Sequence, residues 1–354
     1  MAADALAATS LDGEPIVLVR RGELVESVHR VAACACDDRG RTLVAFGTVD
    51  VPVYLRSSAK PFIAAAAARE GVVERFGIEP QELAVMAASH NGEPFAIKAV
   101  ESLLKKIGAG EDALLCGAHA PYDEGAARAL QASGRQFTAI HNNCSGKHAG
   151  ILALCTALGA DRASYLRPNN PAQQHILALC GRVLDTNADE LPLAVDGCGI
   201  PVFATTLRRA ALAFARLASL DGLDDRDAHA LAAVRAAMLA HPQYVAGTGD
   251  VDTELMLACR GSLVVKSGAE GVFAAGSIPQ RAGLVIKVVD GAARARPPAA
   301  MAVLEELDWL PADAASRLRE FAQTPIYNRA GTLVGSISAT LSAVASRHAT
   351  KRST

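Results

Sequence analysis

The segment RSSAKPFIAAAAARE, residues 56–70, places two serines and a lysine directly before an alanine-rich apolar run. Alanine is the strongest helix former and Pro61 is tolerated in a first turn, so we expect a helix to begin near Ser57. There, free backbone N–H groups and the helix dipole favour negative charge on the serine oxygen. Lys60 lies on the same helical face, within reach of the Ser57 hydroxyl. If this helix is buried, desolvation lowers the pKa of Lys60, and its neutral amine can act as a base.

An S-x-x-K pattern alone most often marks a capping serine followed by a solvated lysine. Two further patterns lie downstream: S-x-N at residues 89–91, and KSG at residues 266–268 directly after the apolar run SLVV. This order is that of class A β-lactamases and penicillin-recognising serine acyltransferases. In such a site the second serine relays a proton and the strand lysine keeps the first lysine neutral. The backbone N–H groups of Ser57 and of a residue near Ala269 would stabilise the oxyanion.

Both ends of the chain predict strands, and the middle predicts helices. Alternating apolar segments broken by turn residues are typical of a β-meander, and glycine-bounded strand segments return after the helical middle. Helices are predicted near residues 297–307 and 311–321. We expect one catalytic domain over residues 1–354 of mixed α/β (α+β) class, similar to serine β-lactamases and penicillin-binding proteins. Its antiparallel sheet would come from about residues 15–56 and 257–340, and its helical segment from about 57–256.

Composition excludes several classes of partner. The chain has 354 residues, of which 51% are hydrophobic, and its net charge of −2 does not favour nucleic acid or a membrane surface. No apolar run approaches the ~18–20 residues of a membrane span. The N-terminus lacks the basic start and apolar core of a signal peptide, so we expect a cytoplasmic protein. Its eight cysteines, which form no C-x-x-C pair, are then reduced thiols.

Two stretches have no counterpart in β-lactamases. NNCSGKHAGILALC contains Cys144 and Lys147, and VDGCGIPVF contains Asp196 and Cys198. By spacing alone these are helix-cap and turn residues. However, a C-x-x-K pattern at a helix N-terminus favours the thiolate, and two thiolates with a neutral amine can hold zinc, with water completing the tetrahedron.

The chain resembles the asparaginase II family, the Rhizobium-type L-asparaginases, from about residue 15 to residue 340. The resemblance is carried by the segments RSSAKPF, ASHNGEP, CGAHAPYD, NNCSGKHAG, RPNNPAQQ, VDGCGIPVF, HPQYVAGTG with DTELM, and KSGAEGVF. It implies a structure related to serine β-lactamases and glutaminases. It also implies hydrolysis of L-asparagine to L-aspartate and ammonia, and a homodimer.

The resemblance also implies roles for individual residues. Ser57 would be the nucleophile, Lys60 its base, and Ser89 and Lys266 a supporting pair. The implied zinc ligands are Cys144, Lys147 and Cys198, and the implied substrate-binding residues are Arg56, His90, Asn91, Asp196, Gly268 and Ala269. Asp196 would recognise the substrate ammonium, and Lys266 its carboxylate. One departure is Asp250, which stands where the family pattern predicts a basic residue.

Three alternatives stay open. A β-lactamase or carboxypeptidase would need export, for which we see no signal. A glutaminase is a closer rival, since one methylene is worth only about 1–3 kcal/mol of discrimination. A non-catalytic amino-acid-binding or zinc-binding protein would not need the complete set of Ser57, Lys60, Ser89 and Lys266. Threonine-dependent asparaginases fit poorly, because no TGGT-like segment is present near the N-terminus.

Overall fold

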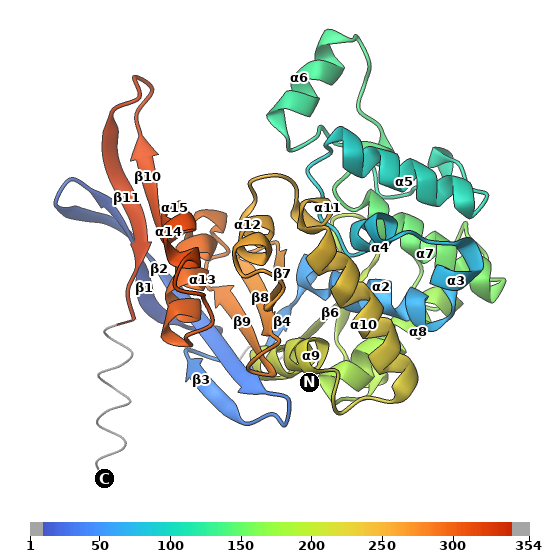
Figure 1. Ribbon diagram of the computed structural model, residues 1–354, viewed down its shortest axis with the longest axis horizontal. Helices are drawn as coiled ribbons and strands as arrows, with labels where there is room; N and C mark the ends of the chain where they lie inside the picture. The colour runs from blue at the N-terminus through green and yellow to red at the C-terminus, as the bar shows by residue number, and fades with distance from the viewer. Residues whose placement is uncertain (1–9, 342–354) are drawn as a thin grey trace.

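A large antiparallel sheet is formed by both ends of the chain, as the sequence predicts. The computed structural model describes residues 10–341, so most of the N-terminal segment assessed for a signal lies outside the described residues. The strand order is β10-β11-β1-β2-β9-β8-β7, with β3 paired to β2. The strands are β1 (Glu14–Arg21), β2 (Leu24–Asp37), β3 (Thr42–Phe46), β7 (Leu263–Gly268), β8 (Val272–Ser277), β9 (Ala282–Val288), β10 (Gln323–Tyr327) and β11 (Leu333–Ala339). This arrangement confirms the predicted fold class (Figure 1).

A second, three-stranded sheet was not expected. Its order is β4-β6-β5, built from β4 (Pro52–Tyr54), β5 (Leu193–Val195) and β6 (Pro201–Thr206). The expectation that residues 52–54 join the large sheet and that residues 193–206 are helical is therefore wrong. Proline removes a helical N–H and glycine favours turns, so the prolines and glycines of PLAVDGCGIP produce a hairpin instead of a helix. This hairpin turn carries Asp196 and Cys198.

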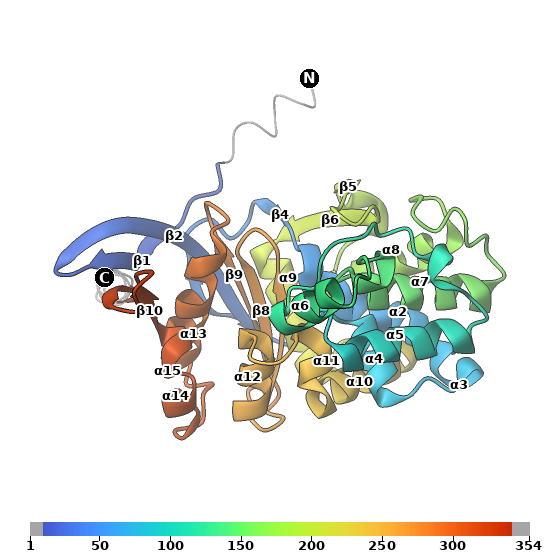
Figure 2. The same ribbon diagram turned by 90° about the horizontal axis from the view of Figure 1, so that it is seen from above.

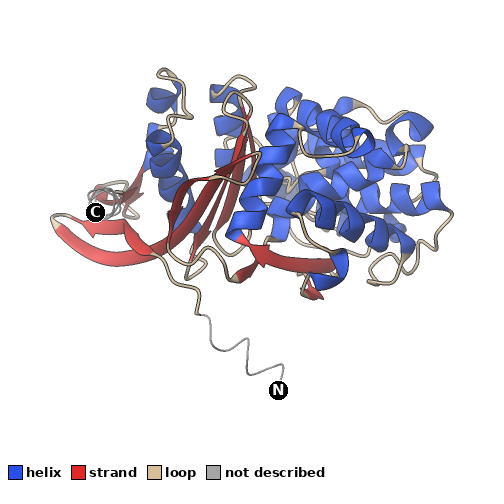
Figure 3. Cartoon of the chain, turned by 90° about the horizontal axis from the view of Figure 1, so that it is seen from below, coloured by secondary structure: helices blue, strands red, loops and turns tan. Residues whose placement is uncertain are grey.

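The helices lie on both sides of the large sheet, and most of them gather on one side of it (Figure 3). They are α2 (Lys60–Arg69), α3 (Val72–Phe76), α4 (Pro80–Met86), α5 (Pro94–Lys106), α6 (Glu124–Ala132), α7 (Ser145–Leu158), α8 (Pro171–Leu184), α9 (Leu207–Ser219), α10 (Asp225–Ala240), α11 (Pro242–Ala246), α12 (Val251–Ala258), α13 (Arg296–Glu306), α14 (Ala314–Arg317) and α15 (Arg319–Ala322). Short 3₁₀ turns are η1 (Arg56–Ala59), η2 (Glu111–Ala113), η3 (Ala139–His141), η4 (Ala188–Glu190) and η5 (Ala293–Ala295). The helix expected over residues 311–321 is divided at Leu318 into α14 and α15.

Helix α2 is buried from Lys60 to Ala67 and packs against α7, α8 and α10. A helix that is apolar on every side needs neighbours on every side, and the small alanine side chains let these helices approach closely. The position of α2 in the middle of the helical part therefore follows from its composition. It also means that Lys60, at the start of α2, is buried.

Helices α9 and α13 cover opposite faces of the large sheet (Figure 2). Gly276 of β8 and Gly283 of β9 are cross-strand partners beneath α9. A Cβ at Gly283 would lie 2.0 Å from the carbonyl oxygen of Ala211 in α9, so only glycine allows this close contact of backbones. Within residues 10–341, no helix is both long and apolar enough to span a membrane.

Candidate active site

Ser57 lies in the 3₁₀ turn η1, immediately before α2, and is partly exposed. The preceding residue, Arg56, has φ of +52°, in the left-handed region that non-glycine residues seldom adopt. Its Nε donates to Oδ1 of Asp196 at 2.8 Å. This ion pair ties the serine-bearing turn to the β5–β6 hairpin and helps to hold a conformation that would otherwise be disfavoured.

Lys60 joins the first sequence pattern to the second. Its Nζ donates to the Ser89 hydroxyl at 2.9 Å and to the Ala88 carbonyl at 2.5 Å. Among residues 10–341 no hydrogen bond joins Lys60 to Ser57, although both line one small cavity of about 10 Å³. The amine therefore stands beside both serines but is hydrogen-bonded to the second.

Burial lowers the pKa of Lys60 to about 8. Two neighbouring cations, Lys147 and Lys266, contribute to this lowering, whereas negative charge on Cys144 opposes it. One pKa unit corresponds to about 1.4 kcal/mol between the two protonation states. A substantial fraction of the neutral amine is therefore present near pH 8, as a general base requires.

The third pattern, KSG, ends strand β7 beside η1. A Cβ at Gly268 would lie 2.7 Å from the carbonyl oxygen of Leu55, so this strand end can approach the Ser57 turn only with glycine there. Lys266 is 1% exposed and its Nζ lies 3.6 Å from Oδ2 of Asp252. Burial lowers the pKa of Lys266, and the charge of Asp252 opposes that effect.

The three patterns meet at one cavity of about 370 Å³, which we call the active-site cleft. Six of the predicted site residues line it: Ser57, Ser89, Asn91, Lys266, Gly268 and Ala269. Asp196 and Arg56 line the adjoining small cavity with Lys60 and Lys147. The cleft also contains residues that the sequence interpretation assigned no role: Tyr122, Asn143, Ala246, Asp252, Ser267, Ala293 and Arg296.

His90 is held by the protein on both ring nitrogens. Its Nδ1 accepts from the Gly92 N–H at 3.1 Å, so the proton is on Nε2, which lies 2.8 Å from the Ser145 hydroxyl. Burial lowers its pKa to about 3. Neither nitrogen is left for a substrate, and this geometry is that of a neutral residue that orders the chain between α4 and α5.

Asp250, the departure from the family pattern, caps helix α12. Its Oδ1 accepts the N–H of Asp252 at 3.0 Å, as an N-cap aspartate does. Burial and the neighbouring Asp252 raise its pKa. Asp252 in turn accepts the N–H of Ser267 at 2.6 Å. Asp250 therefore caps α12, and Asp252, in the first turn of the same helix, holds the KSG strand.

The predicted metal ligands form one buried cluster beneath Lys60. Lys147 Nζ donates to Cys198 Sγ at 2.9 Å. A hydrogen bond from Cys198 lowers the pKa of Cys144 well below its usual value, against the effect of burial. The same bond raises the pKa of Cys198. Burial pulls the pKa of Lys147 down, but the charges of the two cysteines outweigh it and raise the pKa. These directions favour a thiolate at Cys144, a thiol at Cys198 and an ammonium at Lys147.

The donor chemistry of this cluster fits zinc only if the lysine takes part. Among residues 10–341, no group of three or more His, Cys, Asp or Glu side chains could hold a metal ion. Two sulfurs and the Lys147 nitrogen would supply three donors, and a fourth position would remain for water or substrate. Cys198 and Lys147 would both have to lose their protons, so zinc binding at this cluster would be strongly pH-dependent.

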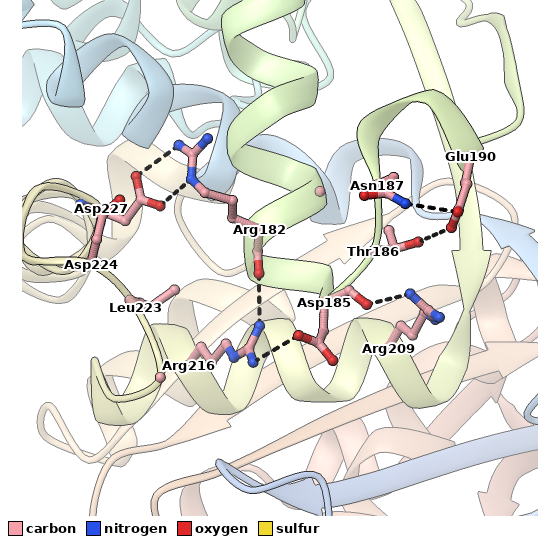
Figure 4. A pocket seen from close by; sticks show the side chains of 12 residues that line it. Arg182, Asp185, Thr186, Asn187, Glu190, Arg209, Arg216, Leu223, Asp224 and Asp227 are labelled. Atoms are coloured by element: carbon pink, nitrogen blue, oxygen red, sulfur yellow. Dashed lines mark hydrogen bonds and ion pairs between the residues drawn. The ribbon is translucent and has the colours of Figure 1, made fainter.

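A separate cavity of about 580 Å³ lies between the end of α8, α9 and the start of α10 (Figure 4). Arg182 makes two hydrogen bonds, of 2.6 and 2.9 Å, to Asp227, and Arg216 donates to the Arg182 carbonyl at 2.8 Å. Arg209 donates to the Asp185 carbonyl at 2.6 Å. The described residues that line this cavity include no serine, cysteine or lysine. Its charged groups form hydrogen bonds that link α8, α9 and α10.

Comparison with known proteins gives one family match. The family model described as L-asparaginase II matches residues 17–339. No curated protein matches the chain. Similar solved structures include Mglu, with 16% sequence identity and a TM-score of 0.38 over 88% of this chain and 74% of Mglu. They also include a protein from Bacteroides dorei with the provisional name beta-lactamase, with 14% identity and a TM-score of 0.36 over 73% of this chain and 84% of that protein.

Proposed function

The chain belongs to the L-asparaginase II family, a family of amidohydrolases, and from this premise we propose that it hydrolyses L-asparagine to L-aspartate and ammonia through a Ser-Lys acyl-enzyme. The observation that carries the proposal is the buried Lys60 amine, 2.9 Å from Ser89 and beside Ser57 in the same site. A lowered lysine pKa next to two hydroxyls is what a lysine base requires.

Acylation begins with Ser57. Its oxygen attacks the side-chain amide carbon of asparagine while the neutral amine of Lys60 takes the hydroxyl proton. Ser89 accepts a proton from the resulting ammonium and passes its own to the departing nitrogen, which leaves as ammonia. The backbone N–H groups of Ser57 and Ala269 are the proposed donors to the oxyanion. The product of this stage is an aspartyl ester of Ser57.

Deacylation uses the same groups in reverse. Water attacks the ester carbon and loses a proton to Lys60, and the Ser57 oxygen recovers a proton as L-aspartate leaves. Lys266 stays protonated through its ion pair with Asp252 and keeps positive charge near Lys60. That charge disfavours a second ammonium and so favours the neutral base.

Asp196 remains the proposed partner of the substrate ammonium. It is mostly buried and bound to Arg56 through Oδ1, which leaves Oδ2 available beside the small cavity. Cys144, Lys147 and Cys198 are the proposed zinc ligands. Zinc, when bound there, would supply positive charge that holds the two thiolates together and fixes the position of the cluster beneath Lys60. The proposed setting is a cytoplasmic homodimer.

Ammonia release tests the proposal directly. Purified protein should release ammonia from L-asparagine faster than from L-glutamine at equal concentration, before and after chelation. A β-lactam hydrolysis assay on the same preparation tests the alternative class. Turnover of L-glutamine at a higher kcat/KM than L-asparagine would replace asparaginase by glutaminase. Absence of ammonia from both substrates, with and without added zinc, would overturn the enzymatic proposal.

A further inference from the structure

The active-site cleft contains an arginine that the proposed mechanism does not use. Arg296 is the first residue of α13 and its side chain lines the cleft together with Ser57, Ser89 and Lys266. In the sequence it lies in RARPPAAMA, which predicts only a loop leading into a helix. The fold brings it to the cleft because α13 packs on the large sheet next to strand β8.

The guanidinium of Arg296 has few hydrogen-bond partners among the described residues. Within residues 10–341 its one hydrogen bond runs from Nη1 to the Gly268 carbonyl at 3.3 Å. Its Nε is buried and has no hydrogen-bond partner among the described residues, and none of their carboxylates forms an ion pair with it. An unmet buried donor on this partly exposed cation is costly, and a ligand anion in the cleft would meet it.

The other cation of the cleft is already engaged. Lys266 is 1% exposed, lies 3.6 Å from the Asp252 carboxylate and donates to the Ser267 carbonyl at 3.0 Å. A point charge neutralised in this way is a weaker partner for a substrate anion than the Arg296 guanidinium, which forms no ion pair with a carboxylate of the described residues, although the Asp250 carboxylate of the same cleft acts on it at longer range. The planar fork of an arginine also matches the two oxygens of a carboxylate. Of the two cations, Arg296 is therefore better suited to bind carboxylate.

We propose that Arg296 binds the α-carboxylate of the substrate and thereby restricts the enzyme to free amino-acid amides. This inference rests on the proposed function, because it assumes that an amino-acid amide occupies the cleft. In this proposal Arg296, and not Lys266, binds the substrate carboxylate. The role of Lys266 is then its electrostatic effect on the pKa of Lys60. The Gly268 carbonyl accepts the hydrogen bond from the Arg296 guanidinium, and Gly268 also lies against the turn that contains Ser57. A substrate bound by Arg296 would therefore lie in the same cleft as the nucleophile.

The test uses three amides that differ only in the groups on the α-carbon. L-asparagine has the ammonium and the carboxylate, succinamate has only the carboxylate, and 3-aminopropanamide has only the ammonium. Arg296→Gln should lower kcat/KM for L-asparagine and succinamate by about 10- to 100-fold, mainly through KM, and leave 3-aminopropanamide within about twofold of wild type. Arg296→Lys should recover part of the loss, because it restores charge without the fork.

Arg294→Gln is the matched control. Arg294 lies two residues away, but its Nε donates to His29 at 3.1 Å and it does not line the cleft in the described structure. This variant should behave as wild type with all three amides. Equal losses by Arg296→Gln on all three amides would show a general structural effect and overturn the inference, as would no loss on any of them.

Binding of the product separates this inference from the proposed function. If the wild-type protein hydrolyses none of the amides, the asparaginase proposal fails, and titration calorimetry with L-aspartate still tests Arg296. Affinity for L-aspartate that is at least tenfold weaker in Arg296→Gln, and unchanged in Arg294→Gln, supports a carboxylate site. Equal affinity in all three proteins, or no binding to the wild type, overturns it.

Discussion

The Nζ of Lys60 lies 2.9 Å from the Oγ of Ser89 and donates a hydrogen bond to it. The two residues are 29 positions apart, on α2 and on the loop after α4, and packing of α4 near the start of α2 brings them together. The lysine of the first motif is therefore hydrogen-bonded to the serine of the second. In the proposed mechanism this contact would be the proton path from Lys60 to the leaving nitrogen.

Ser57→Ala should abolish ammonia release from L-asparagine, with a loss of about 10⁴-fold or more, because the acyl-enzyme cannot form. Ser58→Ala is the matched control. The Ser58 hydroxyl is buried and donates to the Leu55 carbonyl at 2.6 Å, so its loss should lower the free energy of unfolding by about 1 kcal/mol. Turnover by the control should stay close to wild type. Steady-state kinetics and thermal unfolding of both variants check this, and near-native turnover by folded Ser57→Ala would refute the serine mechanism.

In the proposed mechanism Lys60 acts in its neutral form, so the rate should rise with pH. Its pKa of about 8 means that roughly a tenth of the molecules carry the neutral amine at pH 7 and most carry it at pH 9. We expect kcat to fall about tenfold for each pH unit below the pKa. A profile of kcat from pH 6 to pH 9 that stays flat would contradict this role.

Lys60→Arg should be inactive although it keeps the positive charge. A guanidinium stays protonated at these pH values, with a pKa above ~12, and cannot accept the serine proton. Circular dichroism on the same preparation would show whether the variant folds. A folded variant with substantial turnover would mean that another group is the base.

Ser89→Ala should lower kcat by about 10²- to 10⁴-fold while substrate binding changes little, because the relay acts only in the chemical step. Removing the hydroxyl also leaves Lys60 with only its bond to the Ala88 carbonyl among its present hydrogen bonds. Single-turnover measurement of ammonia release checks the expected defect in acylation. An unchanged kcat would exclude Ser89 from the proton path.

Cys144→Ser and Cys198→Ser should release zinc and raise KM more than they lower kcat. Serine oxygen replaces thiolate poorly at zinc, whereas the Lys60–Ser89 contact does not involve either cysteine. Cys155→Ser is a useful control, because this buried thiol lies in the last turn of α7, outside the cluster. Metal analysis and kinetics on the same samples decide the outcome. Full zinc in the two variants would refute the ligand assignment, and a collapse of kcat at unchanged KM would show that the metal acts in the chemical step.

Much of the fold and part of the site are local in sequence, and these parts could be predicted. Alternation of apolar residues at both ends fixes strands, and the alanine run fixes a buried helix with Lys60 at its start. The order of the three short motifs was enough to predict that Ser57, Ser89 and Lys266 share a site. Local spacing could not reveal the β5–β6 hairpin, where prolines and glycines override an apolar pattern that otherwise reads as helical.

Contacts between residues distant in the chain were decided by tertiary structure alone. The sequence determined that Lys60 would lie one helical turn from Ser57, because helical spacing fixes that relation, and left its burial conditional on the burial of the helix. It could not determine that the amine is bonded to Ser89, that Arg56 is paired with Asp196, or that Lys266 is neutralised by Asp252. Nor could the sequence predict that Arg296, at the start of α13, lines the cleft. These relations depend on how helices pack on one another and on the sheet, and such packing joins positions that no local spacing constrains.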